Sequence, residues 1–353
     1  MQSTTSTPRK GNPAGSGAGP RILFAASPAI AVPSLCALSE MEMETGGRGL
    51  VLAGVLTNPD SKRGRHGREE PSDISAAVLE LDAIRGKKGF PPIPQLKPEK
   101  LNAQAREETA ALAPDLLVSF ACGYFFGPRF LALFPLGGIN VHPSLLPKYR
   151  GACPIPAAIL GGETETGICI QKLAPKMDAG DILVTDRFAL SGRETTLSLC
   201  ETVSRRAAVL LRELLVDFVP DSARPQAGEA VYCYEIEKEA GIIDWEKSAA
   251  AIDAQVRAYT PWPLSFTRLG KDTLFILEAQ PLECVPAASL VKEASGTAAP
   301  AGTVLGADKN LGILIQTGDG ILAVSRLQWQ AKKALDWKAF CNGARGFIGA
   351  RLR

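Results

Sequence analysis

Apolar positions in the first two thirds of the chain follow two different periodicities. Short, nearly continuous apolar runs predict buried strands at residues 21–26, 50–56, 115–120, 138–142 and 166–173. Apolar residues at helical spacing predict helices at residues 30–44, 72–84, 98–112, 152–161 and 194–219. Buried strands that alternate with helices are typical of an α/β fold with a doubly wound, mostly parallel, Rossmann-like sheet. The ligand crevice of such a sheet lies at the carboxyl ends of its strands.

The pattern changes after a polar connector at residues 221–240. A helical segment at 248–258 is followed by five short β-type runs with turn signals, namely SFTRLG, DTLFILEA, GTVLGA, LGILIQT and GILAVSRL. This spacing predicts a small β-barrel or a β-sandwich, and of these two we expect the barrel, in an OB-like form. The predicted organisation is a disordered leader at 1–20, an α/β domain at 21–220, a linker at 221–240 and a β-barrel domain at 241–353.

Composition narrows the class of protein. Of the 353 residues, 46% are hydrophobic, and the formal net charge is +2, so any nucleic-acid binding would need a local basic face. No apolar run is long enough for a membrane-spanning helix, and residues 1–20 lack the apolar core of a signal peptide. The eight cysteines are scattered without a CxxC pair. They predict neither a zinc site nor a disulfide framework, and they fit a cytoplasmic protein.

The segment GINVHPSLLPKYRG carries the strongest catalytic candidates, Asn140 and His142. Proline cannot continue a central strand, so the predicted strand ends before Pro143. Residues two apart on a strand point the same way, which places the amide and the imidazole together at a strand's carboxyl end. Such a pair can stabilise an oxyanion and move a proton. The alternative is a histidine that only packs at the strand end.

Asp178 lies in KMDAGD, a turn-forming sequence after the next predicted strand. A carboxylate beside His142 would orient the imidazole and favour its charged form. The alternative is that Asp178 and Asp181 only cap the turn.

Two basic stretches are candidates for contacts with phosphate groups. The first follows the second predicted strand and contains Lys62, Arg63, Arg65 and Arg68. Its glycines predict a flexible loop at the crevice, although Glu69 and Glu70 weaken the charge argument. The second is residues 326–353, with seven basic residues and one acidic residue. In each case an ordinary solvated surface is the alternative.

Taken together, these segments resemble the methionyl-tRNA formyltransferase family over more than nine tenths of the chain. The resemblance is carried, in the family's order, by RILFAASPAIAVPSL, TNPDSKRGRHGREEPS, PDLLVSFACGYF, GINVHPSLLPKYRGACP, ETGICIQKLAPKMDAGDIL, IIDWEKSAAAIDAQVRAYTPWPLSF and WKAFCNGAR. The Asn-x-His pattern before SLLP is specific to enzymes that use formyltetrahydrofolate. The basic loop and the WPLSF region indicate the member that acts on tRNA.

The resemblance implies formyl transfer from 10-formyltetrahydrofolate to the α-amino group of initiator methionyl-tRNA, by a monomer without a metal. It implies catalytic roles for Asn140, His142 and Asp178. The implied folate contacts are Ser144, Leu145, Leu146, Pro147, Phe120, Ala121, Cys122, Gly123 and Tyr124. Arg65 matches a loop arginine that contacts the acceptor end of the tRNA, and Lys62, Arg63 and Arg68 flank it.

Two other functions stay open at this point. A formyltetrahydrofolate-dependent transferase acting on a nucleotide or sugar amine would share Asn140, His142 and Asp178, but it gives no reason for the basic loop and the β-rich C-terminal domain. A non-catalytic folate- or RNA-binding protein would have no need of all three polar residues.

Overall fold

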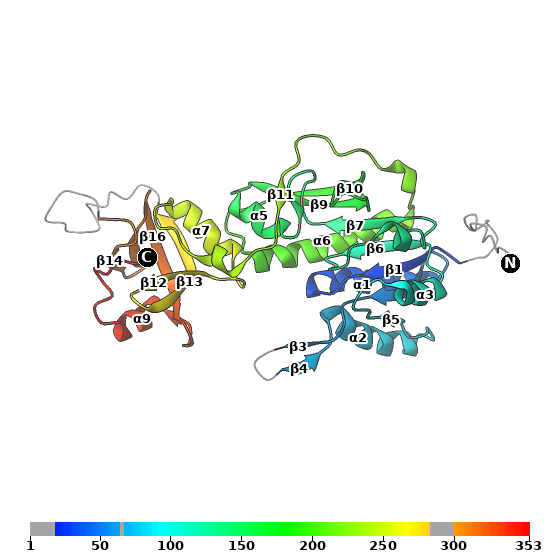
Figure 1. Ribbon diagram of the computed structural model, residues 1–353, viewed down its shortest axis with the longest axis horizontal. Helices are drawn as coiled ribbons and strands as arrows, with labels where there is room; N and C mark the ends of the chain where they lie inside the picture. The colour runs from blue at the N-terminus through cyan, green and yellow to red at the C-terminus, as the bar shows by residue number, and fades with distance from the viewer. Residues whose placement is uncertain (1–17, 64–66, 283–298) are drawn as a thin grey trace. The chain divides into compact units, whose positions relative to one another are not determined.

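The computed structural model describes residues 18–63, 67–282 and 299–353 (Figure 1). Most of the predicted leader therefore lies outside the described residues. The same holds for most of residues 285–301, a stretch rich in alanine and proline whose composition predicts a loop within the C-terminal domain. The chain divides into two compact units. The first comprises residues up to 151 with 166–188 and 200–232, and the second comprises residues 152–165, 189–199 and 233–353. Segment 152–165 groups with the C-terminal part because its helix α5 (Pro154–Leu160) packs against α7 (Ala249–Ala258).

The first unit is built on a seven-stranded sheet in the order β10-β9-β7-β6-β1-β2-β5. Its strands are β1 (Arg21–Ala25), β2 (Val51–Leu56), β5 (Gln95–Leu96), β6 (Leu116–Phe120), β7 (Gly138–His142), β9 (Glu165–Lys172) and β10 (Ile182–Ala189). Neighbouring strands from β7 through β6, β1 and β2 to β5 pair in parallel, whereas β9 pairs antiparallel with β7. The predicted mostly parallel sheet is thus confirmed.

The helices of this part of the chain are α1 (Val32–Thr45), α2 (Asp73–Lys87), α3 (Ala103–Ala111), α4 (Pro128–Leu131) and α6 (Thr196–Val216), with 3-10 turns at Ala29–Ala31 and Pro220–Ser222. Side-chain caps set two of the starts. Ser72 accepts a hydrogen bond from the Ser75 N–H, and Asn102 accepts one from Ala105. The cap at Asn102 explains why α3 begins five residues later than the apolar pattern predicts.

The predicted flexible basic loop is in part a hairpin, which corrects that expectation. Strands β3 (Ser61–Arg63) and β4 (Arg68–Glu70) lie side by side (Figure 1) and pair antiparallel. In their register Lys62 lies opposite Glu69. Cross-strand partners of opposite charge stabilise such a pair. Glu69, which weakens the charge argument, therefore also helps to form the hairpin. Arg65 lies outside the described residues.

The second unit contains one antiparallel sheet. Its strands are β12 (Ser265–Leu269), β13 (Asp272–Leu282), β14 (Val304–Asp308), β15 (Gly312–Gln316), β16 (Ile321–Trp329) and β17 (Leu335–Asp336). They follow the order β12-β13-β16-β15-β14, with β17 beside β16. Helix α9 (Trp337–Gly343) follows β17, and its aromatic Phe340 is buried in the core of this unit. Short elements β8 (Arg150–Gly151), β11 (Tyr232–Cys233) and a 3-10 turn at Lys238–Gly241 complete the described secondary structure.

The last residues of the chain close this sheet into a barrel. Arg353 and Arg268 of β12 exchange two backbone hydrogen bonds, at 2.8 and 3.0 Å. Just before Arg353 the tail pairs with the other edge of the sheet, because the Leu352 N–H donates to the Gly302 carbonyl and the Val304 N–H of β14 donates to the Ala350 carbonyl. Both edge strands are thereby covered, as a barrel requires. Among the described helices, none has the length and apolarity needed to span a membrane.

Candidate active site

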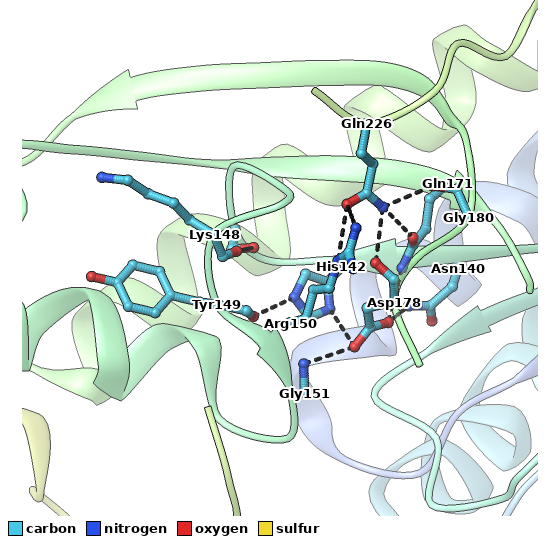
Figure 2. Close-up of polar contacts among 11 residues, drawn as sticks. Asn140, His142, Lys148, Tyr149, Arg150, Gly151, Gln171, Asp178, Gly180 and Gln226 are labelled. Carbon is cyan, nitrogen blue, oxygen red and sulfur yellow. Dashed lines mark hydrogen bonds and ion pairs between the residues drawn. The ribbon is translucent and has the colours of Figure 1, made fainter. Parts of the chain in front are cut away.

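Strand β7 brings two polar side chains to its carboxyl end. Asn140 Nδ2 donates to Asp178 Oδ1 at 3.4 Å, and His142 Nδ1 lies 3.6 Å from Asp178 Oδ2 (Figure 2). Asn140 and His142 therefore share one face of the strand, as their spacing predicts. The His142 side chain is 5% exposed and that of Asp178 is 14% exposed, so the carboxylate acts on the imidazole with little screening by water.

Asp178 is held in place by its turn and by two donors. It lies in the turn between β9 and β10 with a φ of 49°, a left-handed conformation that costs a non-glycine residue about 1 kcal/mol or more. Its Oδ1 accepts from Gln171 Nε2 at 2.8 Å, and its Oδ2 accepts from the Gly151 N–H at 2.9 Å. Both carboxylate oxygens are thus fixed from opposite sides.

His142 is neutral at rest, which differs from the sequence expectation that Asp178 holds it charged. Burial lowers the pKa of His142 below its ordinary value, and the Asp178 carboxylate and the Tyr149 carbonyl oppose this effect only in part. His142 Nε2 lies 2.9 Å from the Tyr149 carbonyl oxygen, which can only accept a hydrogen bond. The neutral ring therefore carries its proton on Nε2. The basic Nδ1 then faces Asp178, which would stabilise a proton arriving there.

Three further residues complete the polar network, namely Gln171, Gln226 and Arg150, and the sequence patterns did not identify them as part of the site. Gln171 lies opposite Asn140 in the β7–β9 register, and it is 1% exposed. Gln226 contacts Gln171 and the Asp178 turn, and its Oε1 accepts from Arg150 Nη2 at 2.7 Å (Figure 2). A glutamine within the apolar run TGICIQKL was a usable signal for Gln171. Gln226 follows a proline in the polar connector, where nothing in the local pattern distinguishes it.

The SLLP stretch forms a turn directly after His142. Ser144 is 1% exposed and donates its hydroxyl to the Lys148 carbonyl at 2.6 Å, so it stabilises the turn itself. Leu145 packs against Gly167 of β9, where any side chain would collide with it. Leu146 is also buried. The structure thus places Ser144, Leu145, Leu146 and Pro147 beside the site, while the folate contact remains a prediction.

The segment after β6 lies next to the same strand end, because Ser119 and Phe120 pair with Asn140 and Val141. Phe120 has no exposed surface, so its side chain packs within the core, and its folate contact remains a prediction. Ala121 and Gly123 are exposed. The Tyr124 hydroxyl donates to the carbonyls of Thr57 and Pro98, and burial raises its pKa to about 12.

Cys122 completes this segment. Its surroundings raise the pKa of the thiol to about 11, mainly through burial. A thiol with so high a pKa is almost entirely protonated at neutral pH, and a protonated thiol is a poor nucleophile. Cys122 is therefore suited to packing rather than to covalent chemistry. Across the part of the chain that the structure describes, no group of three or more histidine, cysteine or acidic residues is arranged to hold a metal ion.

Comparison with known proteins decides the family. A model described as formyl transferase matches residues 22–215, and one described as formyl transferase, C-terminal domain, matches residues 235–345. A methionyl-tRNA formyltransferase of Treponema denticola is 47% identical over 336 residues, which cover 93% of this chain and 98% of that relative. The chain belongs to the methionyl-tRNA formyltransferase family. A second member, from Treponema pallidum, is 41% identical, covering 94% of this chain and 99% of the relative.

Among solved structures, the fold is similar to that of WlaRD, described as a sugar 3N-formyl transferase in the presence of dTDP and 5-N-formyl-THF. The TM-score is 0.56, and the match covers 90% of this chain and all of that chain. The sequence identity is 16%, so this likeness concerns the fold alone.

Proposed function

We propose that the protein transfers the formyl group of 10-formyltetrahydrofolate to the α-amino group of methionine on the initiator tRNA, as a cytoplasmic monomer. The observation that carries this proposal is the convergence of Asn140, His142 and Asp178 at the carboxyl end of β7, in a chain of this family. An amide donor, a neutral imidazole and a carboxylate can together catalyse acyl transfer between two nitrogens, by stabilising an oxyanion and moving a proton.

The reaction starts when the amine nitrogen forms a bond to the formyl carbon and the carbonyl electrons move to oxygen. Asn140 stabilises the resulting oxyanion with an N–H of its side-chain amide. His142, neutral at rest, accepts the proton that the amine loses, and the charged imidazole is stabilised by the Asp178 carboxylate. When the bond to the folate nitrogen breaks, His142 returns the proton to that leaving group. No enzyme nucleophile is needed, because the amine itself attacks.

Asp178→Asn should lower kcat about tenfold and move the acidic limb of the pH–rate profile about one unit lower. The acidic limb reports the pKa of His142, because only the neutral imidazole can accept the proton. An anionic neighbour raises that pKa, so removal of its charge lowers it further. The profile of kcat between pH 5 and 8 measures this. An unchanged profile at full activity would mean that Asp178 only shapes its turn.

The acceptor distinguishes the proposed function from its alternatives. Purified protein should formylate methionyl initiator tRNA and leave amino-sugar nucleotides unmodified. Labelled formyl groups on an amino sugar would favour the small-molecule transferase, and binding of folate or tRNA without turnover would favour a non-catalytic protein.

The tRNA is proposed to contact both basic stretches. In the barrel, Arg268, Arg351 and Arg353 line a cavity of about 520 Å³. Arg326, by contrast, is paired with Glu278 at 3.1 Å, so part of the local positive charge is neutralised within the protein. Arginines that are not neutralised in this way suit phosphate contacts, which carry no sequence preference.

Arg65→Ala should raise the KM for methionyl-tRNA severalfold and leave the KM for formyltetrahydrofolate unchanged. Loss of one phosphate contact should also reduce the slope of log Kd for tRNA against log salt by about one. Arg48→Ala, at an exposed arginine outside the basic stretches, is the matched control and should change neither value. Equal losses for both substrates would indicate misfolding, and no loss for tRNA would make this loop an ordinary solvated turn.

A further inference from the structure

The side-chain amide of Gln226 has a single possible orientation. Its Oε1 accepts from two atoms of the Arg150 guanidinium, Nε at 3.1 Å and Nη2 at 2.7 Å. A guanidinium only donates hydrogen bonds, so the oxygen must face Arg150. The opposite side of the amide, Nε2, then faces three oxygens that only accept. The two halves of the amide are therefore matched to two different surroundings.

That nitrogen holds both ends of the turn that contains Asp178. Gln226 Nε2 donates to the Asp178 and Gly180 carbonyl oxygens at 2.8 Å each, with the Gln171 side-chain oxygen at 3.2 Å (Figure 2). At Gly180 the turn fits tightly against the end of β9, because a side chain at this position would collide with the Lys172 carbonyl. Gln171, which also contacts Gln226, donates to the Asp178 carboxylate. One amide thus supports both the backbone and, through Gln171, the carboxylate of Asp178.

We propose that Gln226, in the first unit after α6, is a positioning residue that fixes the Asp178 carboxylate against His142. The proposal rests on the proposed function, which gives Asp178 its task. Left-handed backbone at Asp178 is unfavourable by itself, so the turn depends on partners that hold it. Loss of the Gln226 donor would let the turn relax and withdraw the carboxylate from the 3.6 Å contact with His142.

The charged groups near Gln226 determine which substitutions can test its positioning role. The charged or titratable groups near Gln226 include Asp178, Arg150, Tyr232 and Lys176. The Tyr232 hydroxyl accepts a hydrogen bond from Arg150, and the Lys176 ammonium lies over the Tyr232 ring. Cys169 faces His142 in the β9 register, and burial raises the pKa of that thiol, so it stays uncharged. A substitution at Gln226 that adds no charge therefore reports on position alone.

Gln226→Met keeps the length of the side chain and adds no charge. We expect kcat to fall about tenfold, the rate equivalent of one ordinary hydrogen bond, with both KM values within about twofold. The acidic limb of the pH–rate profile should move to lower pH, in the same direction as in Asp178→Asn and by less. An unchanged kcat and acidic limb would overturn the proposal.

Gln226→Glu distinguishes the contribution of the contact with Arg150 from that of the contacts with the Asp178 turn. A carboxylate keeps the contact with Arg150 but turns an acceptor towards the Asp178 and Gly180 carbonyls. The proposal therefore predicts a loss of kcat at least as large as that of Gln226→Met. Full activity in Gln226→Glu would contradict it, because the contact with Arg150 alone would then suffice.

Two further variants exclude a general loss of stability. In an Asp178→Asn background, Gln226→Met should cause no further shift of the acidic limb, since no charge remains to be positioned. Gln255 is the matched control, because its buried amide donates to the Gly241 and Ile242 carbonyls at 3.3 and 3.2 Å in the second unit. Gln255→Met should lower the free energy of unfolding and leave the acidic limb in place.

If the proposed function itself were wrong, the activities of the variants would show a different pattern. If His142→Gln and Asp178→Asn kept full activity, the catalytic assignment itself would be wrong. If those two variants lost activity while Gln226→Met did not, only the positioning role of Gln226 would be wrong.

Discussion

His142→Gln should lower kcat by about 10²-fold or more while the protein remains folded. The neutral imidazole is the proposed proton acceptor, and general acid–base groups contribute about 10²–10⁴-fold to rate. The chain has one other histidine, His66, which belongs to the basic loop and lies outside the described residues. Glutamine fills a similar volume and offers hydrogen-bond donors, but it cannot accept a proton at neutral pH. Steady-state kinetics with saturating tRNA measures the loss.

The Kd for formyltetrahydrofolate is the control for this variant and should stay within about threefold of the unaltered protein. A kcat within tenfold of the unaltered value would make His142 a packed histidine at a strand end, the structural alternative that its sequence position leaves open.

Asn140→Ala should lower kcat by about 10²–10³-fold, the range typical for removal of one preorganised donor to an oxyanion. The Asn140 amide nitrogen already lies 3.4 Å from Asp178 Oδ1, so it is oriented before any substrate binds. The effect should fall on kcat rather than on KM, because the negative charge develops only in the transition state.

A matched control for Asn140 exists in the same unit. The Asn102 side chain accepts the Ala105 N–H at 3.0 Å and caps α3. Asn102→Ala should lower the free energy of unfolding by about 1 kcal/mol and leave kcat unchanged. Comparable kcat losses in the two asparagine variants would show that Asn140 supports the fold rather than the reaction.

The sequence predicted the parts of the fold that local patterns encode. Strand β7 has the bounds that its apolar run and Pro143 predict, and its two-residue period placed Asn140 and His142 together. Strand β10 was not predicted, because its side chains alternate between partly buried and exposed positions and two of them are charged. Strands β3 and β4 of the basic hairpin were also not predicted. Their strand character comes from the pairing of charged residues rather than from apolar ones.

The remaining features depend on tertiary structure. The neutral state of His142 follows from burial, which the residues around it in sequence do not reveal, and a neighbouring carboxylate suggested the opposite charge. Gln226 meets Asp178 across 48 positions of sequence, through a contact that no local period encodes. The assignment of residues 152–165 to the second unit has the same origin, because α5 finds its packing partner in α7.

Transfer of a labelled formyl group directly tests whether the protein formylates methionyl initiator tRNA and whether His142 takes part. Purified protein is incubated with methionyl initiator tRNA and 10-formyltetrahydrofolate that carries ¹⁴C in its formyl group, and the tRNA ester is then hydrolysed. We expect labelled N-formylmethionine from the unaltered protein and at least about 10²-fold less in the same time from His142→Gln. Absence of labelled N-formylmethionine with the unaltered, folded protein, or equal label from both proteins, would contradict it.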